Sequence, residues 1–198
     1  MSAALKWNLV SVEDYLDGEL HSPIKHEYVG GVVHAMAGAS NAHNVINYNT
    51  LISIGIRLRG KRCQVHGSDT KVRIDLQNEV RFYYPDQHVF CEPNPLSDSF
   101  QDRPVVIFEV LSRSTRRTDL GEKKDAYLTI PSLRVYGLIE QDEPTVIVFR
   151  RGPKEFAREV YHGLDAVIPL TEIEIELPLA EIYERIEFSP EPVGAEGA

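Results

Sequence analysis

Two carboxylates stand inside apolar segments, where folding alone does not favour a charge. Glu109 interrupts the apolar run 104–111, and Asp86 directly precedes the mostly apolar segment 87–91. A buried carboxylate without a partner is strongly unfavourable and tends to take up a proton. If the two segments form adjacent strands, both carboxyl groups come close to each other. Such a pair repels itself unless a cation compensates it.

That cation could be a lysine or a metal ion. A helix is predicted from about residue 119 to residue 130, and its apolar stripe includes Tyr127 and Ile130. At about 100° per residue, Lys123 falls on this inward stripe and Lys124 at its edge. An inward lysine is explained if it meets a carboxylate or a phosphate. Carboxylate ligands without Cys or His neighbours favour a hard ion, so Mg²⁺ or Mn²⁺ fits better than zinc.

The elements expected to position these residues mix helices and strands. A short helix begins after Ser11 and ends before Gly18, and residues 26–36 form a hairpin around Gly30 and Gly31. The longest helix follows Asn41 and runs up to Gly60.

Short strands dominate the rest of the chain. Because apolar residues occupy both faces of segment 104–111, we expect a central strand that is buried on two sides. The other expected elements are strands over residues 63–66, 70–74, 80–84, 87–91, 133–139 and 145–150, a weaker pair near 156–162 and 166–176, and a short helix near 179–185.

Several motifs occur together and in a fixed order. The main ones are Tyr84-Pro85-Asp86, Phe108-Glu109-Val110-Leu111-Ser112 and Asp119-Leu120-Gly121-Glu122-Lys123, and further ones are residues 26–31, residues 36–40 with His43, and Ser68-Asp69. This set resembles the Uma-type family of restriction endonucleases, which are members of the PD-(D/E)XK nuclease superfamily. The resemblance covers roughly residues 11–151.

The resemblance implies a restriction-endonuclease-like α/β fold, with a central mixed β-sheet flanked by helices, as a single domain over residues 1–188. It also implies a metal-dependent nuclease site made by Asp86, Glu109 and a lysine. The superfamily's E-x-K motif would put this lysine at the position of Leu111. The resemblance implies that in this family the lysine stands on the following helix, which agrees with the inward position expected for Lys123.

The roles follow from phosphodiester chemistry. Asp86 and Glu109, with the backbone carbonyl of Val110, would hold Mg²⁺ or Mn²⁺, and Lys123 would orient the attacking water or stabilise the phosphate. The secondary candidates are Glu27 and Asp69 as further ligands or supporting partners, His43 as a phosphate contact, and Lys124 as a substitute for Lys123. The expected activity is hydrolysis of DNA phosphodiester bonds by a metal-dependent endonuclease.

Other interpretations stay open at the level of sequence. Asp86 could be an ordinary turn residue after proline, and Glu109 with Lys123 could form a buried ion pair without catalysis. The chain could then be a weak or inactive nucleic-acid-binding or assembly module, or it could hydrolyse another phosphate ester. The basic cluster of residues 113–117 is either a solvated loop or a phosphate clamp.

Charge and composition narrow the class of protein. The chain has 198 residues, 26% of them charged, and a net charge of −9, which argues against coating nucleic acid by electrostatics alone. Residues 140–198 hold 14 acidic and 5 basic residues, so the surplus acid is C-terminal and the preceding part is neutral.

We expect a cytoplasmic protein that does not cross a membrane, because no apolar run is long enough to do so. Cys63 and Cys91 form no CxxC pair and are expected to be reduced thiols. A homodimer is expected by analogy with enzymes that cut both DNA strands. Residues 189–198, rich in Pro, Gly and Glu, are expected to be a disordered tail.

Overall fold

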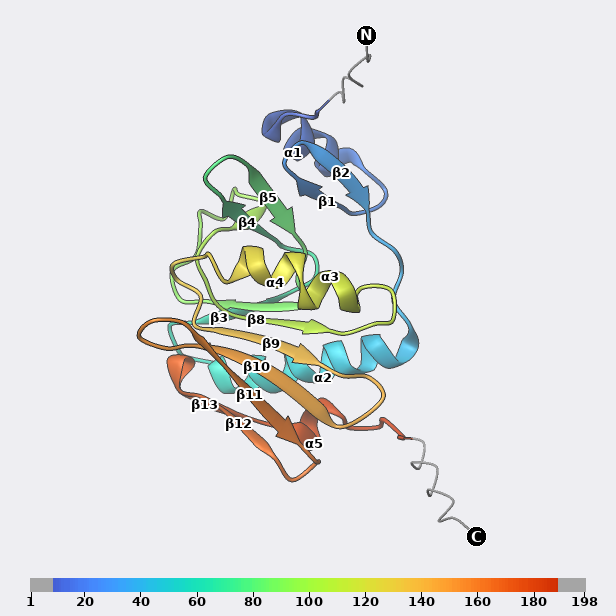
Figure 1. Cartoon of the computed structure of the whole chain (residues 1–198), viewed down its shortest axis with the longest axis vertical. Coiled ribbons are helices and arrows are strands. Elements are labelled where there is room, and N and C mark those ends of the chain that lie inside the picture. The colour runs from blue at the N-terminus through green and yellow to red at the C-terminus, as the bar shows by residue number, and fades with distance from the viewer. Residues whose placement is uncertain (1–8, 189–198) are drawn as a thin grey trace.

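A six-stranded sheet forms the centre of the fold in the computed structural model, which describes residues 9–188 (Figure 1). Its strands lie in the order β11 (Phe156–His162), β10 (Thr145–Arg151), β9 (Val135–Ile139), β8 (Pro104–Val110), β6 (Gln87–Phe90) and β3 (Gln64–Gly67). β8 and β9 run parallel, whereas the other neighbours are antiparallel, so the sheet is mixed as expected. The tail predicted at residues 189–198 lies outside the described residues.

A second and a third sheet were not anticipated as separate units. The second has five strands in the order β2 (Val32–Ala35), β1 (His26–Val29), β5 (Val80–Tyr83), β4 (Lys71–Asp75) and β7 (Phe100–Gln101). The third joins β12 (Val167–Leu170) to β13 (Ile175–Pro178) around the 3-10 turn Thr171–Ile173. The β1–β2 hairpin confirms the Gly-Gly turn, because Gly30 and Gly31 both have positive φ angles.

Five α-helices accompany these sheets in the described part of the chain: α1 (Val12–His21), α2 (Asn41–Leu58), α3 (Arg116–Leu120), α4 (Glu122–Tyr127) and α5 (Leu179–Ile182). Ser11 caps α1 as expected, but Gly18 lies inside that helix instead of after it. The helix expected over residues 119–130 is in fact two short helices. Gly121 separates them with non-helical backbone angles, and a side chain there would crowd the carbonyl oxygen of Arg117.

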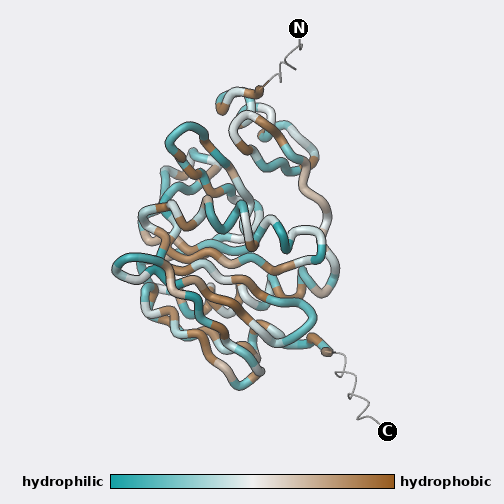
Figure 2. Tube along the Cα trace, viewed as in Figure 1, coloured by the Kyte–Doolittle hydropathy of each residue, from teal (hydrophilic) through white to brown (hydrophobic). Residues whose placement is uncertain are grey.

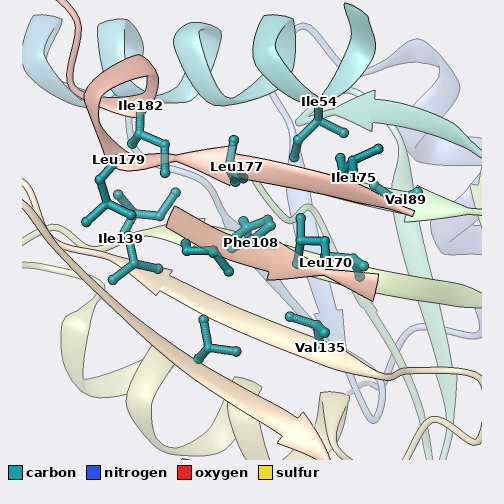
Figure 3. Packing of buried hydrophobic residues seen from close by; sticks show 14 of the residues in the cluster. Ile54, Val89, Phe108, Val135, Ile139, Leu170, Ile175, Leu177, Leu179 and Ile182 are labelled. Atoms are coloured by element: carbon teal, nitrogen blue, oxygen red, sulfur yellow. The ribbon is translucent and has the colours of Figure 1, made fainter. Parts of the chain in front are cut away.

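One face of the central sheet packs against α2, the β12–β13 pair and α5. Figure 3 shows this apolar cluster, in which Phe108 and Val135 of the sheet meet Ile54 of α2 and Leu177 of β13. Gly137 of β9 pairs with Phe108, and a side chain at Gly137 would overlap the Phe108 ring. This apolar cluster covers the face of β8 opposite to the Glu109 side chain.

The opposite face of the central sheet packs against α4 and the five-stranded sheet. Ile107 and Leu111, on either side of Glu109, belong to this second apolar cluster together with Tyr127 of α4 and Tyr83 of β5. β8 is therefore buried on both faces, as predicted, and the hydropathy colouring in Figure 2 shows the apolar character of the central strands. Glu109 is consequently a charged residue on an apolar face of the sheet.

The structure also bears on the state of the two cysteines and on the presence of a membrane-spanning helix. Cys63, directly before β3, and Cys91, directly after β6, form a disulfide, so the prediction of two reduced thiols is wrong. Their segments meet because β3 and β6 are antiparallel neighbours. In residues 9–188 we find no helix with the length and apolar character required to cross a membrane.

Candidate functional site

The pairing of β6 with β8 brings Asp86 and Glu109 together. Gln87 pairs with Phe108 in antiparallel register, so Asp86 and Glu109 lie opposite each other one residue further along. The Asp86 amide lies 3.3 Å from Glu109 Oε2, and the Val110 amide donates to Asp86 Oδ2 at 2.7 Å. The side chains are 13% and 5% exposed, respectively. Both carboxylates are thus held at one point on the sheet.

α4 brings Lys123 to these carboxylates. Its Nζ lies 2.7 Å from Glu27 Oε1 on β1 and 3.7 Å from Glu109 Oε1, and its side chain is 8% exposed. A third carboxylate, Asp119 at the end of α3, lies 3.7 Å from the same ammonium. One turn further along α4, the Tyr127 hydroxyl donates to Glu109 Oε1 at 3.3 Å. The lysine on the inward face of the helix therefore meets carboxylates from three elements.

The first turns of α2 contact Asp86 from the other side of the site. The Ser40 side chain caps this helix by accepting a hydrogen bond from the His43 amide. His43 Nε2 lies 3.2 Å from Asp86 Oδ2, and Asn47 Nδ2 lies 3.4 Å from Asp86 Oδ1. Asn47 is itself fixed by the fully buried Gln87, whose Nε2 donates to Asn47 Oδ1 at 2.6 Å. α2 thereby orients the Asp86 carboxylate.

Negative charge exceeds positive charge in this group. We call Glu27, Asp86, Glu109 and Asp119 the carboxylate cluster, and Lys123 is the lysine that contacts it. Burial raises the pKa of Glu109 well above its usual value; Lys123 opposes this rise, but the neighbouring carboxylates add to it. Burial also raises the pKa of Asp119, whose Oδ1 is buried without a hydrogen-bond partner. The cluster is therefore short of positive charge.

The surplus of negative charge raises the pKa values of both Lys123 and His43. Burial lowers the pKa of Lys123, but Glu109, Glu27 and Asp119 outweigh burial and raise it. For His43, burial again lowers the pKa, while the hydrogen bond to Asp86 and the contact with the Val110 backbone raise it above its usual value. Both groups are stabilised in their protonated forms by the cluster.

The donor set fits a hard divalent cation. Within residues 9–188 no three His, Cys, Asp or Glu side chains are grouped as a ready metal cage. Asp86 and Glu109 nevertheless lie on paired strands, where the Asp86 amide contacts the Glu109 carboxylate and the Val110 amide donates to the Asp86 carboxylate. Mg²⁺ is usually bound by one or two carboxylates, with water and substrate phosphate completing its shell. The residues present suit that mode of binding.

Two of the secondary candidates join this group and two do not. Glu27 reaches it through Lys123, and His43 reaches it through Asp86. Asp69 is 95% exposed and pairs with Lys25 at 2.9 Å, away from the cluster. Lys124 faces Asp125 at 3.5 Å and the ring of Phe149, so it does not substitute for Lys123 in this geometry.

Sequence reasoning missed three residues of the group: Asp119, Tyr127 as a hydrogen-bond donor, and Asn47. Asp119 had a usable signal, because it stands four residues before the inward Lys123. Asn47 had none, because its role depends on how α2 lies against β6.

Comparison with known proteins identifies the family. The family model Uma2, described as "Putative restriction endonuclease", matches residues 12–180. This chain belongs to the Uma2 family. Two proteins of Synechocystis sp. are similar to it: "Uncharacterized protein slr1290", 33% identical over 72% of this chain and 74% of that protein, and "Uncharacterized protein sll1609", 30% identical over 67% and 76%.

A solved structure shares the fold of this Uma2 chain. It is a "putative nuclease belonging to DUF820" from Anabaena variabilis, with a TM-score of 0.65, 20% sequence identity, and coverage of 84% of this chain and 96% of that chain. The resemblance read from the motifs and the expected mixed α/β, nuclease-like fold are thereby confirmed.

Proposed function

We propose that this Uma2 protein is a Mg²⁺- or Mn²⁺-dependent endonuclease that hydrolyses phosphodiester bonds in DNA. The observation that carries the proposal is the meeting of Asp86 and Glu109 at the β6–β8 junction, inside a carboxylate cluster that Lys123 alone does not neutralise. Membership of the family supports a nuclease in general.

Asp86, Glu109 and the carbonyl of Val110 are the proposed holders of the metal ion. When bound, the ion would supply Lewis-acid stabilisation of negative charge on the phosphate and a more acidic water. Asn47 and His43 restrain the Asp86 carboxylate, and Tyr127 restrains Glu109. These contacts reduce the rearrangement that the two carboxylates need before they act together.

Lys123 is proposed to keep Glu109 ionised and to offer a positive charge to the reacting phosphate. Its contact with Glu27 at 2.7 Å is shorter than its contact with Glu109 at 3.7 Å, so Glu27 anchors the ammonium beside the site. His43 Nε2 lies 3.2 Å from Asp86 Oδ2, so His43 is proposed to act by holding that carboxylate in place beside the reacting phosphate.

The test compares two acid-to-amide variants. Asp86→Asn removes a proposed metal ligand, whereas Asp69→Asn makes the same chemical change on the exposed surface. We expect wild type and Asp69→Asn to cut plasmid, linear or single-stranded DNA when Mg²⁺ or Mn²⁺ is added, and Asp86→Asn to have lost both cutting and metal binding measured by calorimetry. Equal cutting by all three proteins would refute the assignment.

The alternative is a catalytically weak or inactive nucleic-acid-binding or assembly module. It is favoured by the shorter distance of Lys123 to Glu27, which resembles a buried structural ion pair. Wild type that neither binds metal nor cuts any DNA would support this alternative. We also propose a cytoplasmic homodimer as the active form, which sedimentation of the purified protein and fractionation of cells can test.

A further inference from the structure

The loop that joins β8 to α3 carries an unusual concentration of positive charge. Residues 112–118, which we call the arginine loop, comprise this connection and the first residues of α3, and have the sequence Ser-Arg-Ser-Thr-Arg-Arg-Thr. The loop starts three residues after Glu109 and ends directly before Asp119. Both of its ends therefore lead into the carboxylate cluster.

Internal contacts hold the arginine loop in shape. The Thr115 amide donates to Ser112 Oγ at 3.1 Å, and the Ser112 amide lies 3.3 Å from Thr115 Oγ1. Arg116 makes two hydrogen bonds to the Glu140 carboxylate, at 2.5 and 2.8 Å, and these bonds raise the pKa of its guanidinium. Arg116 thus anchors the loop to Glu140, the residue that follows β9.

Arg113 and Arg117 differ from this anchor. Both are exposed, and within residues 9–188 neither makes an ion pair or a side-chain hydrogen bond, although the chain has 30 acidic and 21 basic residues. Arg113 precedes α3, whereas Arg117 lies in its first turn. The loop therefore presents two uncompensated guanidinium groups while Arg116 between them is paired.

We propose that Arg113 and Arg117 form a clamp for the phosphodiester backbone next to the bond that is cut, an inference that rests on the proposed function. Guanidinium groups bind phosphate oxygens through paired hydrogen bonds, and an ordered loop limits the entropy lost on binding. Because the chain has a net charge of −9, electrostatic attraction for nucleic acid has to come from a local basic patch. A patch beside the carboxylate cluster would hold the backbone where it can react.

The test measures binding of a short fluorescein-labelled DNA duplex by anisotropy at several salt concentrations, with EDTA present so that cleavage does not occur. The double variant Arg113→Ala/Arg117→Ala is compared with Lys154→Ala/Arg158→Ala, which removes the same charge from two exposed residues at and near β11. Each lost phosphate contact reduces the slope of log K against log salt by about 0.9. We expect the clamp variant to bind more weakly with a slope reduced by about 1.8, and the control to keep the wild-type slope.

The replacement Arg113→Lys/Arg117→Lys separates charge from geometry. We expect it to recover the salt slope but not the full affinity, because lysine lacks the paired donors of arginine. Equal binding by the clamp variant and the control would overturn the clamp, even if the wild type cuts DNA. Clamp-dependent binding without metal-dependent cutting would instead overturn the proposed function, and a wild type that neither binds nor cuts DNA would overturn both.

Discussion

Removing the ammonium of Lys123 should destabilise the metal-free protein strongly. In Lys123→Met the side chain keeps most of its apolar stem, but Glu27, Glu109 and Asp119 lose the cation that lies within 3.7 Å of each of them. At an effective dielectric constant of about 20, the attraction to Glu27 at 2.7 Å is roughly 6 kcal/mol, and to each other carboxylate at 3.7 Å roughly 4.5 kcal/mol. Desolvation of the buried ammonium offsets most of this gross attraction.

Because the partners stay buried without a cation, we expect the free energy of unfolding to fall by about 3–5 kcal/mol. The matched control is Lys124→Met, whose ammonium faces the largely exposed Asp125 at 3.5 Å, and which should change stability by less than about 1 kcal/mol. Urea unfolding with EDTA present measures both values. A Lys123→Met protein as stable as the control would refute the view that this lysine compensates the cluster.

The loss of unfolding free energy in Lys123→Met, which we call its stability deficit, should be smaller at low pH than at high pH. The folded pKa values of Glu109 and Asp119 are raised by burial and held down in part by Lys123, so loss of the lysine raises them further. A carboxyl whose folded pKa is raised binds more protons when folded, and stability therefore falls as pH rises through that window. The lysine itself adds no slope there, because its stabilisation is lost only above its usual pKa of 10.5. We expect a smaller deficit at about pH 5 than at about pH 8, and an equal deficit would contradict this reasoning.

Three further changes test the carboxylate cluster, the packing of the central sheet and the disulfide. Glu109→Gln replaces a buried carboxyl whose charged form is disfavoured by burial and by the neighbouring carboxylates, so unfolding with EDTA should show equal or higher stability. Calorimetry should show lost Mg²⁺ binding, and lower stability with metal binding retained would contradict the metal assignment. Gly137→Ala forces a methyl group into the Phe108 ring and should lower the free energy of unfolding in urea by about 1–3 kcal/mol. Adding Phe108→Leu should restore part of this loss, and an unchanged urea midpoint in Gly137→Ala would argue against this packing. Reducing the Cys63–Cys91 disulfide frees a loop of 28 residues and should lower stability by about 3–4 kcal/mol, whereas identical unfolding with and without reductant would show that the bond contributes nothing.

Much of the fold could be predicted because its signals are local. The periodicity of α2 and the two apolar faces of β8 lie within single segments of sequence. The division of the strands into separate sheets had no such signal, because Tyr28 pairs with Phe82, which is distant along the chain. The break at Gly121 was also hidden, since a glycine inside a helical pattern is usually tolerated.

The residues of the candidate site likewise include some that the sequence revealed and some that it did not. Asp86, Glu109 and Lys123 stood out because each is polar at an apolar position, and the structure brings these three together. Asp119 was overlooked because the helix was expected to begin there, and an acidic residue at the start of a helix is ordinary; only its spacing of four residues from Lys123 pointed to it. Asp69 entered through the resemblance alone, and a motif match carries no information about exposure, so its exposed position could not be foreseen.

The displaced lysine and the apolar residue at the E-x-K position are physically linked. Leu111 lies two residues after Glu109, on the same face of the sheet, and is buried in the apolar cluster that includes Ala126 and Tyr127 of α4. This cluster holds α4 against β8, and Lys123 stands one turn before Tyr127 on the side that faces Glu109. A lysine at position 111 would bury a second charge at the contact that docks the helix. An apolar residue at 111 therefore allows α4 to pack closely, and that packing delivers an ammonium group to the same carboxylate from the helix instead of the strand.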